Sequence, residues 1–87
     1  MARFDLAGAT ETGPSGNIDE TLFQLGIASS TGRDGEPDLI AAHKWFNLAA
    51  MRGNNEAARY RQEIAMELTA AQIAEAQRAA REWIRTQ

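Results

Sequence analysis

The chain contains no cysteine and a single histidine, His43, among its 87 residues. Without cysteine it forms neither disulfides nor thiolate metal sites, and one histidine is too few for the usual zinc ligand sets. We therefore expect no metal and no cofactor, and a fold that depends on side-chain packing alone.

Basic side chains and long apolar runs are also scarce. Nine Lys and Arg stand against twelve Asp and Glu, a net charge of −3, whereas nucleic acid binding needs clustered positive charge. No stretch approaches the roughly 20 apolar residues of a membrane span, and the opening MARFDLAGATETGPSGN has the pattern of neither a secretory signal nor a transit peptide. These features predict a cytoplasmic protein that neither binds nucleic acid nor inserts directly into a membrane.

Length and composition together predict one domain with one modest core. Residues 1–16 are rich in Gly, Thr, Ser, Ala and Pro and have few large apolar side chains. We expect them to form a flexible N-terminal tail. Residues 17–87 then make up the folded domain.

Capping and terminating residues define two helices in the first half of this domain. Asn17 and Glu20 have the spacing of a capping box, which predicts a helix over residues 18–31 that Gly32 ends. After the turn GRDGEP, Asp38 is placed to cap a second helix that runs to Arg52.

Two more helices follow in the second half. Asn54 is placed to cap a helix over residues 55–67. Thr69 and Gln72 form a second capping-box pattern, which opens a last helix near the end of the chain. Four helical segments with short connections predict an all-α domain.

Apolar residues recur at helical spacing in these segments. In the first helix the apolar stripe consists of Leu22, Leu25, Gly26 and Ser29, and in the last helix it consists of Ile73, Ala76, Ala80, Trp83 and Ile84. The second helix is apolar over most of its circumference, so its neighbours must cover it on two sides.

The middle of the chain carries a regular spacing of Leu, Gly, Ala and aromatic residues. It runs LGxxSxxG and, after a short loop, DxxxAxxWFxxAAxxGNxxA, and its positions are Leu25, Gly26, Gly32, Asp38, Ala42, Trp45, Phe46, Ala49, Ala50, Gly53 and Ala57. Over residues 21–57 this resembles the Sel-1-like repeat, a helix-pair module of about 36 residues related to tetratricopeptide repeats. The resemblance implies an α-α superhelix of about four antiparallel helices in a small bacterial protein, with residues 55–86 as a degenerate capping pair.

Packing considerations agree with this resemblance. A single helix pair cannot bury its own apolar stripe, so one repeat needs a capping pair stacked upon it. The alanine pairs let helix backbones come close, and we expect Trp45 and Phe46 to fill the space beside them.

Three positions depart from the family's pattern. Ser29 stands where the family has tyrosine, which leaves less bulk between the paired helices. The loop glycine expected at Asp34 is at Gly35 instead, and a second repeat would have Leu-Gly where this chain has Arg61 and Gln62.

No arrangement of residues indicates catalysis or metal binding. The acids in segment 34–38 alternate like calcium ligands, but Leu39 and Trp45 occupy the positions where an EF-hand requires Gly and Glu. His43 has no nucleophile or orienting acid in a recognisable arrangement with it. We therefore expect a protein that is not an enzyme.

Phe23 and Ile27 point a quarter-turn or more away from the stripe of the first helix. Either they widen the core, or together with Gln24 they form an exposed surface that binds another protein or a second copy of the chain.

Two hypotheses for the function follow. The first, implied by the resemblance because larger members of the family serve as scaffolds, is a protein–protein interaction module or adaptor whose partner is unidentified and can be the chain itself. The alternative is a small accessory or regulatory subunit that stabilises a larger enzyme or membrane complex.

Overall fold

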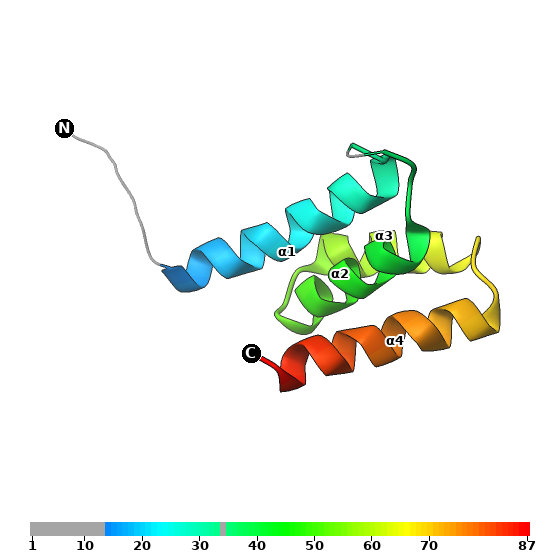
Figure 1. Cartoon of the computed structure of the whole chain (residues 1–87). Helices are drawn as coiled ribbons and strands as arrows, with labels where there is room; N and C mark the ends of the chain where they lie inside the picture. Colours follow the sequence, from blue (N-terminus) through cyan, green and yellow to red (C-terminus); the bar gives the residue numbers. More distant parts are fainter. Residues whose placement is uncertain (1–13, 34) are drawn as a thin grey trace.

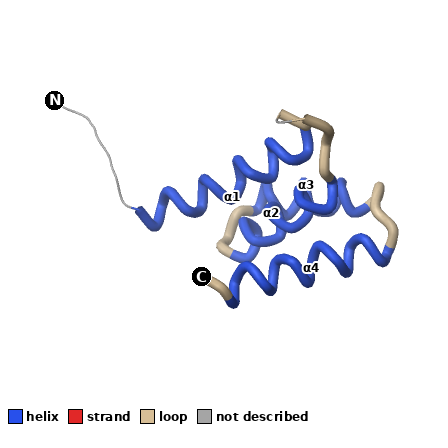
Figure 2. Tube along the Cα trace, in the orientation of Figure 1, coloured by secondary structure: helices blue, strands red, loops and turns tan. Residues whose placement is uncertain are grey.

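A computed structural model of the chain describes residues 14–33 and 35–87, shown as a cartoon in Figure 1 and by secondary structure in Figure 2. In these ranges the backbone forms four α-helices and no strand, which confirms the all-α prediction. The helices are α1 (Pro14–Thr31), α2 (Leu39–Met51), α3 (Asn55–Ala65) and α4 (Ala70–Arg85). Successive helices run in opposite directions (Figure 1), and none of the four has the length and apolar character needed to cross a membrane.

The start of α1 differs from the prediction. The helix begins at Pro14, so the expected start at residue 18 with Asn17 as its cap is wrong. Proline suits the first turn of a helix, because its ring fixes φ near the helical value and the amide it lacks has no partner there. Residues 14–16, predicted to belong to the tail, are therefore helical, and the rest of the predicted tail, residues 1–13, lies outside the described residues.

The other three helix starts are confirmed. The side chains of Asp38 and Asn54 each accept a hydrogen bond from the backbone amide three residues later, at 3.0 and 2.9 Å. At α4 the exchange is reciprocal: the Gln72 amide donates to Thr69 Oγ1 at 3.1 Å, and the Thr69 amide donates to Gln72 Oε1 at 2.8 Å. Each cap satisfies amides that the first helical turn leaves without partners.

The turn after α1 depends on a glycine. Gly32 has φ of +75°, and a Cβ at this residue would lie 2.6 Å from the carbonyl oxygen of Gly35 and 2.8 Å from the nitrogen of Pro37. Only glycine fits this conformation without strain. The turn therefore ends α1 as predicted and directs the chain back toward α2.

Helix α2 lies at the centre of the fold. It packs against α1, α3 and α4, whereas these three helices make few or no contacts with one another. In Figure 1, α1 and α4 lie on opposite sides of α2. This arrangement agrees with the prediction that the neighbours of the second helix cover it on more than one side.

Four alanines, three large aliphatic residues and one phenylalanine form the middle of the core. Its buried members are Leu22, Ala42, Phe46, Leu48, Ala49, Ala57, Ile64 and Ala80. Phe46, which is 1% exposed, covers Gly26 of α1 so closely that a Cβ there would lie 2.6 Å from two carbons of the ring. The absence of a side chain at Gly26 is thus what allows α1 to approach α2.

Some predicted core residues are more exposed than the apolar stripes suggest. Leu25 is 37% exposed and Ile84 is 45% exposed. Both lie on helices that pack mainly against α2, so side chains at the edges of their stripes have no second helix to cover them. Trp45 is half-buried and packs edge-on against Trp83 at 6.3 Å between ring centroids, so Phe46 rather than Trp45 fills the centre.

Replacing Gly26 with alanine tests the contact with Phe46. At an exposed helical site this change stabilises a helix by up to about 1 kcal/mol, but here the added methyl group meets the ring, and we expect a loss of about 1–3 kcal/mol. In thermal unfolding followed by circular dichroism, Gly26→Ala lowers the Tm by at least about 4 °C.

Two further variants control for other causes. Gln24→Ala, on the exposed face of the same helix, leaves the Tm nearly unchanged. In the double variant Gly26→Ala/Phe46→Leu the two losses do not add, because the smaller side chain makes room for the methyl group. Full additivity would contradict a direct contact.

Candidate functional site

Phe23, one of the three residues predicted to bind a partner, belongs to an aromatic cluster inside the fold. The Phe23 ring of α1 lies 5.7 Å from that of Phe46 and 5.9 Å from that of Tyr60, centroid to centroid. Phe46 and Tyr60 are themselves 5.3 Å apart. These distances are typical of stabilising aromatic pairs, so Phe23 joins α1 to α2 and α3.

The other two predicted binding residues have different surroundings. Ile27 is half-buried and packs against the core, while Gln24 is exposed and its Nε2 donates to Glu20 Oε2 at 2.8 Å. Phe23 and Ile27 thus widen the core, which is the first of the two alternatives given for them above. Ile27 keeps one edge in a surface groove beside Tyr60.

This groove runs between α1 and α3 and has a volume of about 320 Å³. Its apolar floor consists of Ile27, Phe46, Tyr60 and Ile64. Ser30 and Thr31 line the side of α1, and Glu63 and Glu67 line the other side. We call it the α1–α3 groove. It presents apolar side chains with carboxylates at their edge.

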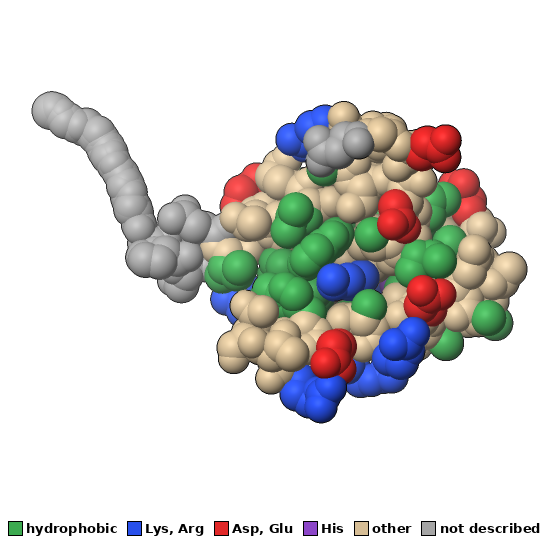
Figure 3. All heavy atoms as spheres, viewed as in Figure 1, with side chains coloured by type: hydrophobic (Ala, Val, Ile, Leu, Met, Phe, Trp, Pro, Cys, Tyr) green, Lys and Arg blue, Asp and Glu red, His purple; other side chains and the backbone are tan. Residues whose placement is uncertain are grey.

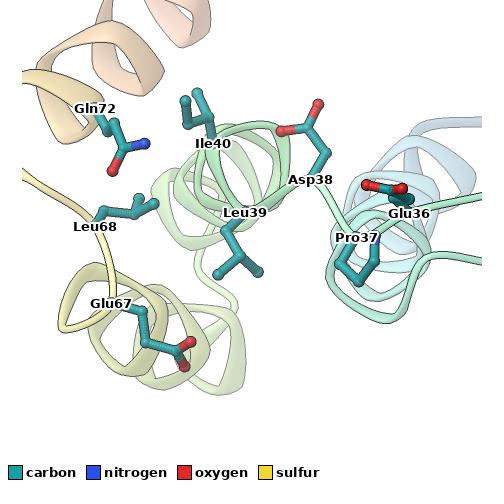
Figure 4. A pocket seen from close by; sticks show the side chains of 8 residues that line it. All are labelled: Glu36, Pro37, Asp38, Leu39, Ile40, Glu67, Leu68 and Gln72. Carbon is teal, nitrogen blue, oxygen red and sulfur yellow. The ribbon is translucent and has the colours of Figure 1, made fainter.

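A second hollow, of about 520 Å³, lies where the chain enters α2 and leaves α3 (Figure 4). We call it the end hollow. In Figure 4 the side chain of Leu39 lies between Glu67 on one side and Asp38 and Glu36 on the other, with Leu68 above Glu67 and Ile40 beside Asp38. Pro37 and Gln72 complete its lining.

A third hollow opens between α1 and α4 and has a volume of about 230 Å³. Its apolar lining comes from three helices: Leu22, Leu48, Met51, Trp83 and Ile84. Hydrophobic side chains gather on this side of the molecule between α1 and α4 (Figure 3). Met51 is 61% exposed. We call this surface the α1–α4 patch.

Arg52 marks the edge of the α1–α4 patch. It forms an ion pair with Asp19 of α1 across the end of α2. No prediction from the sequence pointed to this patch, although Leu48 and Met51 are spaced to lie on one side of the second helix, which is a signal for it.

A smaller hollow of about 200 Å³ is lined by Leu25, Ala28, Ser29, Gly32, Glu36 and Asp38. The backbone closes this region, because the Asp38 amide donates to the Ser29 carbonyl oxygen at 2.9 Å. The hollow lies beside α1 and the turn that follows it, and no residue of α2 lines it, so it does not test the reduced bulk predicted between the paired helices.

His43 is 3% exposed, and its Nδ1 atom is buried without a hydrogen-bond partner. Burial lowers the pKa of His43 below its ordinary value of 6.5, and the positive charge of Arg61 lowers it further. Arg61 of α3 donates from Nη1 to Asn47 Oδ1 at 2.7 Å. The hydrogen bond to Asn47 holds the guanidinium of Arg61 against α2, the helix that carries His43.

Nothing around His43 forms a catalytic group in the part of the chain that the structure describes. No hydrogen bond joins the imidazole to a Ser, Asp or Glu side chain there. The described residues also contain no group of three His, Asp or Glu side chains that could hold a metal ion. His43 is best understood as a neutral core residue.

The buried neutral His43 predicts a dependence of stability on pH. Because its pKa is lower in the folded chain than in the unfolded chain, the unfolded chain takes up the proton first as the pH falls below 6.5. Stability contributed by the neutral imidazole is therefore present above that pH and declines as the pH falls toward the folded pKa. Urea unfolding between pH 7.5 and pH 5.5 measures this decline.

The variant His43→Leu removes the titrating group while retaining an apolar side chain of similar reach. We expect its stability to change less than that of the wild type over the same pH range. Equal slopes in the two proteins would show that other groups cause the pH dependence.

Comparisons of the chain with models of protein families, with curated proteins and with solved structures found no match. The resemblance to Sel-1-like repeats therefore rests on the residues between positions 21 and 57. The candidate binding surfaces rest on their own geometry and chemistry.

Proposed function

We propose that this chain is a protein–protein interaction module, an adaptor built on a short Sel-1-like repeat of the α-α superhelix type. The repeat spacing supports the proposal, as does the antiparallel packing of α1 on α2 over the same residues. A cytoplasmic location in a bacterial cell is part of the same proposal.

The observation that carries the proposal is the α1–α4 patch. Its apolar side chains come from three helices. Met51 is 61% exposed and Ile84 is 45% exposed. Contiguous apolar surface of this kind marks sites of protein interaction. Methionine and tryptophan, both present in the patch, are enriched in such interfaces.

In this proposal the residues of the α1–α4 patch bind the partner, and Phe23 and Ile27, which pack on the core, do not. A charge at Phe23 would enter the cluster with Phe46 and Tyr60 and unfold the protein rather than test an interface. Met51 and Ile84 are suitable positions, since both are exposed in the patch.

The test compares substitutions inside and outside the α1–α4 patch. Met51→Asp and Ile84→Asp place a charge in the patch, whereas Met66→Asp places the same charge on a side chain that is 81% exposed and lines none of the hollows described above. All three variants should unfold within a few degrees of the wild type. Affinity capture from the native host, followed by mass spectrometry, should recover a partner with the wild type and Met66→Asp and lose it with the other two.

The same experiment separates the two functional hypotheses. A single partner recovered in a fixed ratio favours the accessory or regulatory subunit, and several substoichiometric partners favour the adaptor. Light scattering of the purified chain identifies the case in which the partner is a second copy. Capture that is equal for all variants, or no partner and no self-association, would contradict the proposal.

A further inference from the structure

The α1–α3 groove and the end hollow adjoin each other, because Glu67 lines both. Four acidic residues line the combined surface: Glu36, Asp38, Glu63 and Glu67. No lysine or arginine lines either hollow. Acids and bases are nearly equal in number over the described residues, so this surface has a local excess of negative charge.

The ion pairs of the described residues lie mostly elsewhere. Asp19 pairs with Arg52, and Glu82 pairs with Arg85. Arg59 lies 3.5 Å from Glu56 and 3.4 Å from Glu63. Within the described ranges, Glu36, Asp38 and Glu67 form no ion pair, although Asp38 accepts the capping hydrogen bond of α2. Of the four carboxylates, Glu36 and Glu67 thus form neither an ion pair nor a capping hydrogen bond within the described ranges, and they are available to an external cation.

Apolar surface lies between these carboxylates. In the end hollow, Leu39 lies between Glu67 and the two acids Glu36 and Asp38 (Figure 4), and Ile40 and Leu68 add to the apolar lining. In the α1–α3 groove, Ile27 and Tyr60 lie beside Glu63 and Glu67. A ligand that matches both properties must carry apolar groups and positive charges close together.

We infer that the α1–α3 groove and the end hollow together bind a cationic amphipathic segment of a partner protein. Apolar side chains of that segment enter the two hollows, and its Lys or Arg side chains meet Glu36 and Glu67. Nucleic acids and anionic lipid surfaces fit poorly, since their phosphates are repelled by the same carboxylates. The inference rests on the proposed function, because it specifies the chemistry of one partner of the interaction module.

The charge arrangement also predicts how binding responds to salt. The carboxylates of Glu36 and Glu67 belong to exposed residues, so ions in solution screen their attraction for the partner. Charges at the edge of an interface mainly speed association and select the partner, while the apolar contacts hold it in place. Affinity should therefore fall as salt is added but should not vanish.

Binding is tested with the full chain and three fluorescein-labelled synthetic peptides of equal length. One contains Lys and Leu, the second contains Glu in place of Lys, and the third contains Ser in place of Leu. Fluorescence anisotropy should detect the Lys/Leu peptide, no binding of the Glu/Leu peptide and binding at least about tenfold weaker for the Lys/Ser peptide. Equal binding of the first two peptides would overturn the role of charge.

Variants matched in charge identify the surface that binds. Glu36→Gln/Glu67→Gln removes two carboxylates from the end hollow, and we expect affinity for the Lys/Leu peptide to fall about tenfold. Glu20→Gln/Glu75→Gln removes two exposed acids from α1 and α4 and should change affinity less than about twofold, because the net charge change is the same but the site is intact. Equal losses in the two double variants would show attraction by net charge alone and overturn the inference.

The apolar contribution is tested in the same assay. Ile40 lines the end hollow but is not among the half-buried residues that pack on the core, so Ile40→Ser should weaken peptide binding with little change in Tm. Met66→Ser is the control and should leave affinity unchanged. Amide chemical shifts of the isotopically labelled chain should move at residues that line the two hollows.

The outcome also distinguishes this inference from the proposed function. Shifts confined to the α1–α4 patch, or no binding of the Lys/Leu peptide by a chain whose natural partner depends on Met51, would overturn the inference and leave the interaction module standing. If the Met51, Ile84 and Met66 variants all still captured the partner, the proposed function would instead be contradicted. Peptide binding that depends on Glu36 and Glu67 would still support the acidic site in that case.

Discussion

The close approach of α1 to α2 at Gly26 and Phe46 is the constraint on which the rest of the structure depends. Because Gly26 has no side chain, the Phe46 ring can lie against the backbone of α1 and remain fully buried. The same ring contacts Phe23 and Tyr60. One side chain of α2 thereby fixes the positions of α1 and α3, and the alanines at 42, 49 and 57 permit close packing around it.

This central position of α2 determines which surfaces remain open. A helix at the centre is covered by three neighbours, but those neighbours make few contacts with one another. The spaces between α1 and α4 and between α1 and α3 are therefore only partly filled, and both contain apolar side chains. In a chain of this size the surfaces suited to binding follow directly from how the core is packed.

Local signals in the sequence predicted much of the fold, whereas residues whose surroundings depend on distant segments were less predictable. The caps at Asp38, Asn54 and Thr69 involve a side chain and an amide three residues away, so a short stretch of sequence specifies them. The predicted start of α1 is wrong because the capping-box spacing of Asn17 and Glu20 lies inside a helix that begins at Pro14. Leu25 and Ile84 were assigned to the core because periodicity identifies the apolar face of a helix but does not show where its neighbours end.

The charges of the binding surfaces were also only partly predictable from the sequence. On α3 and α4, Arg59 and Arg85 pair with acids three or four residues away, and such pairs can be recognised from sequence spacing. Glu36 and Glu67 lie in connections between helices, and Glu63 lies at the end of α3, so their proximity arises only when the turn at Gly32 and the end of α3 meet at the start of α2. The alternating acids of segment 34–38 lack the Gly and Glu that an EF-hand requires at positions 39 and 45. In the folded chain, Glu36 and Asp38 lie beside Leu39, Ile40 and Leu68, on a surface whose apolar character favours a polypeptide ligand over a bare ion.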